Sequence, residues 1–188
     1  MCILIVLVII GTVSGLAQGT WKNLQFGTSP AEVKASLSKQ GLSLQRSDEG
    51  WEVKPQWNLR VPNVKIPFHF SPYLSFSGTN KLERIELDLQ TDRHMAEGVD
   101  ATLLTEAAAP YIHEQLVGKY GKPVSQVGIC DRVSVNELIG GPGRVECKAV
   151  WKAAGQTVTL NWTYFERSVG VGELFFSITY LSSQSGGL

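Results

Sequence analysis

Apolar and polar positions alternate with period two over most of the chain after residue 50, and this pattern predicts β-strands. In the run 51–60, the odd positions include Trp51, Val53, Trp57 and Leu59. The same alternation predicts strands over the ranges 66–76, 82–90, 124–131, 144–152, 156–165 and 173–181. Within 66–76, two prolines, Pro67 and Pro72, indicate an edge strand or a bulge. Since no helical pattern separates the strands inside each group, neighbouring strands are expected to pair antiparallel.

Two segments carry helical signals instead. Ser29 stands three residues before Glu32, which is the spacing of a capping box, and Gly41 supplies a left-handed stop for a helix that runs to about residue 40. A second helix is predicted from about residue 102 to residue 120, where Pro110 should kink it or split it in two.

One helix followed by about four strands therefore occurs twice. This order predicts an α+β fold made of two helix-plus-antiparallel-sheet halves in tandem, with a single domain built on one shared sheet as the alternative. The predicted divisions are a signal peptide over 1–17, a first half over 18–95 and a second half over 96–188.

The first 17 residues, MCILIVLVIIGTVSGLA, contain no charge and end in the small-residue pattern Gly15-Leu16-Ala17. This is typical of a cleavable secretory signal and predicts a bacterial protein of the periplasm or the extracellular space. A retained membrane anchor is the alternative, although a span needs about 20 apolar residues. The segment lacks the Lys or Arg that usually opens such a signal, so a start upstream of Met1 also stays open.

Signal cleavage would remove Cys2 and leave the pair Cys130 and Cys147. In an oxidising compartment, two thiols 17 positions apart are expected to form a disulfide. The alternative, a catalytic thiol, needs an activating base, and no His lies near either Cys in the sequence.

The chain carries 17 basic and 17 acidic residues, for a net charge of zero. Such a chain has no general attraction for nucleic acid or anionic lipid, so neither nucleic-acid binding nor stable membrane insertion after signal cleavage is expected. The expected partner is another protein. A candidate partner face is the uncharged side of two predicted strands, which carries Thr159, Asn161, Phe175 and Thr179. The alternative is that the threonines are there for strand propensity alone.

No motif predicts a catalytic, cofactor or metal site. The histidines His69, His94 and His113 show no metal-ligand spacing, and His69 is expected to be solvated on the polar face of its strand. The four tryptophans Trp51, Trp57, Trp151 and Trp162 are in phase with the aliphatic positions of their strands, which predicts core packing.

Two segments resemble parts of small exported bacterial domains in which helices pack on an antiparallel sheet. FGTSPAEVKASL, at 26–37, resembles their helix entry, and LVGKYGKP, at 116–123, resembles their helix exit. Both are similar to segments of the outer-membrane assembly lipoprotein BamE and of the β-lactamase inhibitory protein. The resemblance implies a helix-on-sheet fold and an envelope location, and it implies no catalytic or binding residue. This chain departs from the lipoprotein pattern because Cys2 lies at the wrong end of the apolar segment for lipidation.

Together these observations predict an exported, non-enzymatic binding or envelope-associated protein that contacts another protein through a sheet face or loops. Two alternatives stay open. One is a periplasmic hydrolase that uses paired carboxylates such as Glu83 and Glu86. The other is a carrier of a small ligand or lipid, with a cavity between sheet and helices.

Overall fold

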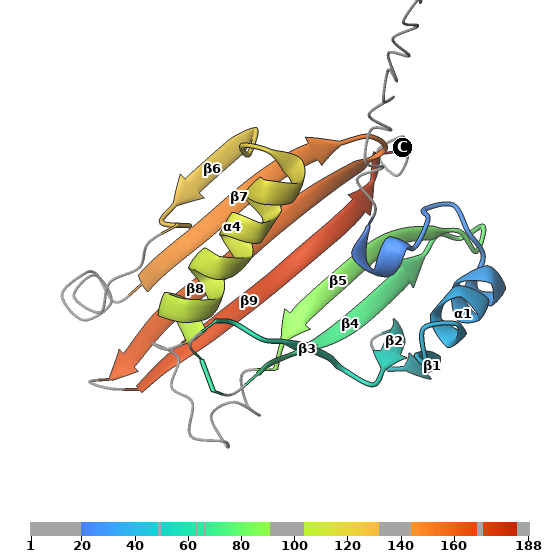
Figure 1. Cartoon of the computed structure of the whole chain (residues 1–188), viewed down its shortest axis with the longest axis horizontal. Coiled ribbons are helices and arrows are strands. Elements are labelled where there is room, and N and C mark those ends of the chain that lie inside the picture. The colour runs from blue at the N-terminus through green and yellow to red at the C-terminus, as the bar shows by residue number, and fades with distance from the viewer. Residues whose placement is uncertain are drawn as a thin grey trace, which may run out of the picture.

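The computed structural model describes residues 20–48, 50–62, 64–65, 67–90, 104–131, 144–168 and 171–183. In these residues, nine antiparallel strands form one sheet with the order β1-β2-β4-β5-β9-β8-β7-β6, and β3 pairs with β4 beside β2 (Figure 1). The strands are β1 (Ser43–Ser47), β2 (Gly50–Lys54), β3 (Trp57–Leu59), β4 (Phe68–Phe76), β5 (Leu82–Leu89), β6 (Ser125–Gly128), β7 (Arg144–Ala153), β8 (Gln156–Ser168) and β9 (Val171–Ser182). The predicted signal peptide over 1–17 and the predicted boundary at residues 95 and 96 lie outside the described residues.

Four helical segments accompany the sheet in this part of the chain. They are the 3-10 turn η1 (Trp21–Asn23), the α-helices α1 (Pro30–Ser38) and α4 (Ala109–Tyr120), and the π-helical turn η2 (Leu104–Ala108) directly before α4. Among the described residues, no helix is long and apolar enough to span a membrane.

The predicted fold class, α+β in two tandem halves, is wrong, because the described chain is predominantly β. Its two α-helices are short, with nine residues in α1 and 12 in α4, whereas β8 alone extends over 13 residues. In addition, β5 pairs with β9 from Arg84↔Leu181 to Asp88↔Ser177. Strands from both predicted halves therefore belong to one continuous sheet, which is the arrangement given above as the alternative.

The start of α1 confirms the predicted capping box. The Ser29 hydroxyl accepts from the Glu32 amide, and the Glu32 carboxylate accepts from the Ser29 amide at 2.7 Å. The Glu32 carboxylate accepts from the Ser29 amide and also from the Ser29 hydroxyl, and because both bonds favour the ionised carboxylate, they lower the pKa of Glu32. Gly41 has a φ of +73°, which matches the predicted left-handed stop.

Pro110 acts on the second helix as predicted. The helical segment is split into η2 and α4, and Pro110 lies in the first turn of α4, where its missing N–H breaks no hydrogen bond. The helix ends at Tyr120 and is capped by Gly121, whose φ is +80°.

The predicted single strand over 51–60 is two strands, β2 and β3, with Pro55 and Gln56 between them. This interruption explains how the internal strand β4 accommodates a proline. Pro72 pairs with Leu87 of β5 on one side, and on the other side it lies between the residues of β4 that pair with β2 and those that pair with β3. The expectation that β4 is an edge strand is therefore wrong, whereas a register irregularity does occur at its end, between Ser75 and Phe76.

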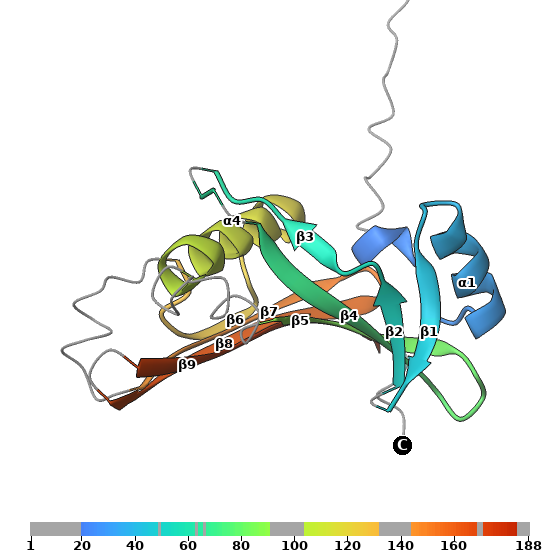
Figure 2. The same cartoon turned by 90° about the horizontal axis from the view of Figure 1, so that it is seen from below.

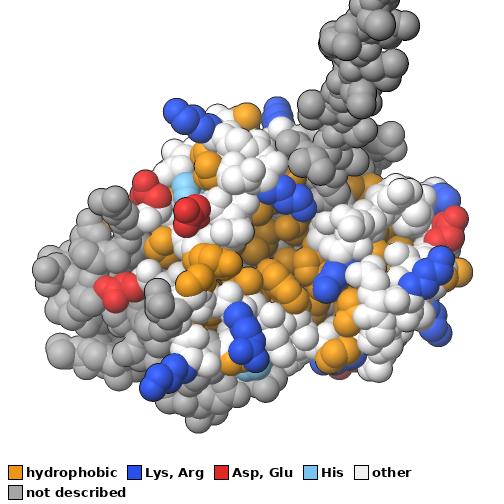
Figure 3. All heavy atoms as spheres, in the orientation of Figure 1, with side chains coloured by type: hydrophobic (Ala, Val, Ile, Leu, Met, Phe, Trp, Pro, Cys, Tyr) orange, Lys and Arg blue, Asp and Glu red, His pale blue; other side chains and the backbone are white. Residues whose placement is uncertain are grey.

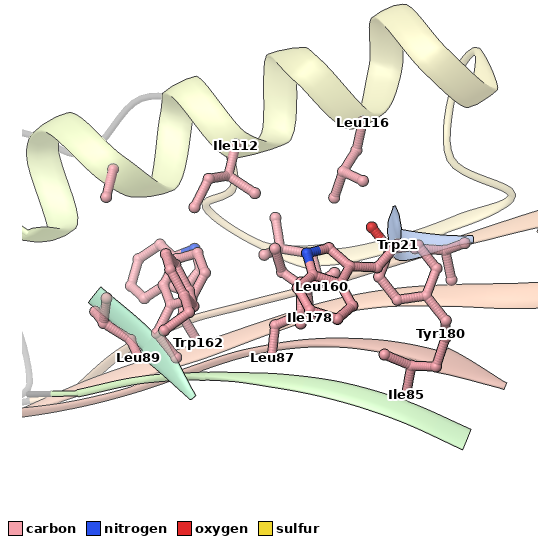
Figure 4. Packing of buried hydrophobic residues seen from close by; sticks show 14 of the residues in the cluster. Trp21, Ile85, Leu87, Leu89, Ile112, Leu116, Leu160, Trp162, Ile178 and Tyr180 are labelled. Carbon is pink, nitrogen blue, oxygen red and sulfur yellow. The ribbon is translucent and has the colours of Figure 1, made fainter. Parts of the chain in front are cut away.

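One face of the sheet, here called the inner face, packs against α4. Figure 2 shows α4 on this side of β5, β7, β8 and β9, and no described helix on the opposite side. In Figure 4, Ile112 and Leu116 of α4 point toward the sheet, and Trp21 of η1 lies between α4 and the strands. The prediction of core tryptophans is confirmed: Trp151 and Trp162 are fully buried, and Trp51 and Trp57 pack against the core from partly buried positions.

The predicted disulfide between Cys130 and Cys147 is confirmed. It joins the segment that follows β6 to the middle of β7, and both cysteines are buried. The adjacent Gly128 has a φ of +77° and lies so close to the backbone of Glu146 that a Cβ atom would collide with it. Glycine is therefore required where the edge strand β6 turns toward the disulfide.

Candidate interaction surface

The side of the sheet opposite α4, here called the outer face, carries the candidate site. On each of the four adjacent strands β5, β9, β8 and β7, the residues of one parity point away from the helix, because successive strand side chains alternate between faces. The outer face consists of Arg84, Glu86 and Asp88 on β5, Phe175, Ser177, Thr179 and Leu181 on β9, Thr157, Thr159, Asn161, Thr163 and Phe165 on β8, and Arg144, Glu146, Lys148, Val150 and Lys152 on β7.

The four residues predicted as a partner face lie together at the centre of the outer face. Thr159 pairs with Thr179 across β8 and β9. Asn161 lies two residues further along β8 and pairs with Ser177, which is two residues from Phe175 on β9. No residue of this central part is charged. A sheet face with many hydroxyl groups and no charges is less strongly hydrated than a Lys/Glu face, and it therefore loses less on contact with another protein.

Phe175 is the most exposed aromatic side chain of this centre, with 60% of its surface accessible. Its ring packs edge-on against Phe165, with 6.1 Å between ring centroids, and the guanidinium of Arg144 lies 5.1 Å from the Phe165 centroid. These contacts hold an apolar ring in place on the surface, which lowers the entropy cost of burying it against a partner. Leu181, on the same strand, is 40% exposed.

A shallow pocket of about 330 Å³ adjoins Phe175. It lies where β5 ends at Leu89 while β9 continues toward Val171, so it occupies a step in the sheet. The residues that line it are Asp88, Leu89, Asn161, Leu174, Phe175, Phe176 and Ser177. A partner side chain of moderate size could insert here beside the Phe175 ring.

Charged residues border the uncharged centre on both sides. On β5, the Arg84 guanidinium lies 2.6 Å from the Glu86 carboxylate, and on β7 the Arg144 guanidinium lies 2.7 Å from that of Glu146. Lys148 and Lys152 of β7 are exposed, and neither has an ion-pair partner among the described residues. The β7 border therefore carries excess positive charge, and β5 contributes the carboxylates of Glu86 and Asp88.

The sequence pattern missed the contribution of the edge strand β6. Val127, 60% exposed, pairs with Lys148 and extends the apolar part of the outer face beyond β7. Val124, directly before β6, is 61% exposed. The strand predicted over 124–131 was the signal that could have identified these exposed valines. If no helix covers the strand, its valines are exposed.

The carboxylates considered for hydrolysis do not meet in a common pocket formed by described residues. Glu86 bonds to Arg84 on the outer face, whereas Glu83 lines a separate pocket of about 430 Å³ together with Ser77, Lys81 and Ser182. This arrangement lacks the facing pair of carboxylates that glycoside hydrolysis requires.

The prediction that His69 is solvated is wrong. It is only 6% exposed, and its Nδ1 lies 2.6 Å from Oδ1 of Asn58, because β3 pairs with this part of β4 and places Asn58 directly beside His69. His113 is buried in α4, with its ring 5.8 Å from that of Trp151, and His94 lies outside the described residues. In the part of the chain that the structure describes, no group of three or more His, Cys, Asp or Glu side chains could hold a metal ion.

The helical side of the molecule looks different from the outer face. Figure 3 shows hydrophobic side chains gathered at the centre of this side, beside α4, with Lys and Arg side chains around them. Trp21 lies between α4 and the strands, where it is 7% exposed (Figure 4). The indole therefore occupies part of the region in which the carrier alternative places a ligand.

Comparison with known proteins gives no relative from which to assign a role: no protein-family model matches this chain, and no curated protein or solved structure matches it significantly.

Proposed function

We propose that this chain is an exported, non-enzymatic binding protein that contacts another protein through the outer face of its sheet. The single observation that carries this proposal is the uncharged centre around Thr159 and Thr179, with the 60% exposed ring of Phe175, on a face that no described helix covers.

The two faces of the same strands differ in a way that supports this function. The side chains on the outer face could be Lys or Glu without any cost to the core, since they point away from it. Most outer positions of β7 are charged in this way. The outer positions of β8, in contrast, carry the uncharged Thr157, Thr159, Asn161 and Thr163. Interfaces are depleted of charge at their centre and polar at their rim, and the outer face has the same distribution.

Export is supported by the disulfide together with the uncharged apolar segment over 1–17. Disulfides such as Cys130–Cys147 persist in oxidising compartments and are rare in the bacterial cytoplasm. The proposed location is the periplasm or the extracellular space.

Lysine footprinting provides the test. Cells that produce the protein are treated with a membrane-permeant acylating reagent, and the modification of each lysine is compared by mass spectrometry with that of the purified protein at high dilution. Lys148 and Lys152, on the outer face, are expected to be modified several-fold less in the cell, because a partner covers them. Two exposed lysines away from the outer face serve as matched controls: Lys34 lies on α1, and Lys39 is the C-cap of this helix. Both should be modified equally in the two samples.

Equal modification of all four lysines in both samples would contradict the proposed binding surface. The same spectra report the N-terminal peptide of the protein. A start at Gln18 is expected if the signal is cleaved, and a start at Met1 in the exported protein would contradict cleavage.

A further inference from the structure

We propose that the partner of the outer face is a second copy of this chain, bound face to face with two-fold symmetry. This inference rests on the proposed function, because it names the occupant of the same surface. It follows from one row of residues across the sheet, whose two ends carry opposite charges.

The register of the strands places opposite charges at the two ends of one row. Asp88 on β5 pairs with Ser177 on β9, Ser177 with Asn161 on β8, and Asn161 with Lys148 on β7. The row thus begins with a carboxylate, crosses two uncharged residues and ends with an ammonium group.

A two-fold axis that runs parallel to the strands, between β8 and β9, reverses the strand order of the second copy. It places β7 of one copy over β5 of the other and leaves each row facing its own equivalent. Lys148 of one copy then faces Asp88 of the other, and the same contact occurs twice. Oppositely charged groups that meet across an interface favour this orientation over others.

The centre of the face is compatible with the same arrangement. β9 of one copy lies over β8 of the other, so the exposed ring of Phe175 meets Thr163, its partner in the row, through the threonine methyl group. Around this contact, Thr159 and Thr179 face each other with hydroxyl groups that both donate and accept hydrogen bonds.

Two rows do not favour the pairing. Arg84, Leu181, Thr157 and Lys152 share a row, so Arg84 would face Lys152 of the other copy. In the next row, Glu86 would face the apolar Val150. The Arg84 guanidinium is already bonded to Glu86 at 2.6 Å, which offsets its charge.

The area of the face fits a pair that forms and dissociates. Four strands about 4.8 Å apart, each contributing about eight residues, cover on the order of 500 Å² per copy. Two copies would bury on the order of 1,000 Å², which is in the range of weak, transient interfaces and indicates a weak dimer rather than an obligate one. We therefore expect association that depends on protein concentration.

Sedimentation velocity over a concentration series tests this proposal, with the disulfide-bonded protein that begins at Gln18. The wild-type protein should pass from monomer to dimer in the micromolar range, and rising salt should weaken the dimer because the facing charges are screened. Lys148→Glu and Asp88→Lys should each weaken association by about 10-fold or more, since each places like charges together twice. The double variant, Lys148→Glu with Asp88→Lys, restores opposite charges and should recover most of the affinity.

Lys34→Glu, on the exposed side of α1, is the control and should associate like the wild-type protein. A wild-type protein that is a monomer at every concentration would overturn the proposal. So would a double variant that associates no more strongly than the single variants, provided that its thermal unfolding matches that of the wild-type protein. The proposed function would survive a monomeric result if Lys148 and Lys152 are still protected in the cell, because the partner is then a different protein. Without such protection, both proposals fail.

Discussion

Phe176→Ala is expected to lower the free energy of unfolding by about 3–5 kcal/mol, whereas Phe175→Ala, one residue earlier, should change it by about 1 kcal/mol or less. Phe176 is on the inner face, where it is 4% exposed, pairs with Trp162 and packs edge-on against Phe70 at 6.0 Å. Removing its ring leaves a cavity in the core. Phe175 is 60% exposed and loses mainly its contact with Phe165.

Urea denaturation of the two variants and the wild-type protein measures this difference. The pair is well matched, since both residues are phenylalanines of β9 and only the face differs. The effect on partner binding should be reversed, because Phe175→Ala removes the exposed ring of the proposed surface while the core stays intact. Equal losses of stability in the two variants would contradict the assignment of the faces.

The second large effect is expected from removal of the disulfide. A Cys130→Ala/Cys147→Ala double variant should be less stable by about 3 kcal/mol, because the bond closes a loop of 17 residues and restricts the unfolded chain. Both cysteines are buried, so alanine avoids placing a new polar group in the core. Chemical denaturation of the variant and of the oxidised wild-type protein gives the difference.

The control is the wild-type protein unfolded in the presence of a reductant, which should be destabilised by a similar amount. A double variant as stable as the oxidised protein would show that the bond does not restrict the unfolded chain as expected.

Cys147 is buried on the inner side of β7, whereas the next residue, Lys148, is exposed on the outer face. Lys148 should therefore keep its reactivity in a variant that is still folded.

The inner and outer faces could be predicted from sequence because a strand shows its burial directly as a period of two. Along β8, Trp162 is buried and Asn161 is exposed, as the alternation indicates. The capping box at Ser29 and the disulfide were predictable for a similar reason: each depends on a short stretch of chain or on two residues of known chemistry.

The joining of the two predicted halves could not be obtained in this way. It depends on pairing between β5 and β9, strands that are about 90 residues apart, and nothing local in either strand specifies its neighbour. β1 was missed because Leu44 is its single buried residue, so no alternation is visible. The burial of His69 was not predictable because its neighbour Asn58 comes from β3, a separate segment that pairs with β4.

The candidate site was found only in part for the same reasons. Thr159, Asn161, Phe175 and Thr179 were identified from the parity of two strands, and their meeting at one place follows from the register of β8 and β9. The contributions of Lys148 and Val127 depend on the position of β7 and β6 beyond β8, which only the sheet order reveals.

The central claim is that the outer face binds a protein, and position-specific photo-crosslinking tests it most directly. A photoreactive phenylalanine derivative replaces Phe175 in the producing cells, and in a second, otherwise identical protein it replaces Glu114, which is exposed on α4 at the opposite side of the molecule. Irradiation should give a discrete protein adduct from position 175 and none from position 114, and an adduct of twice the mass of the chain identifies a second copy. The absence of an adduct from position 175, or the same adducts from both positions, would contradict the proposed binding surface.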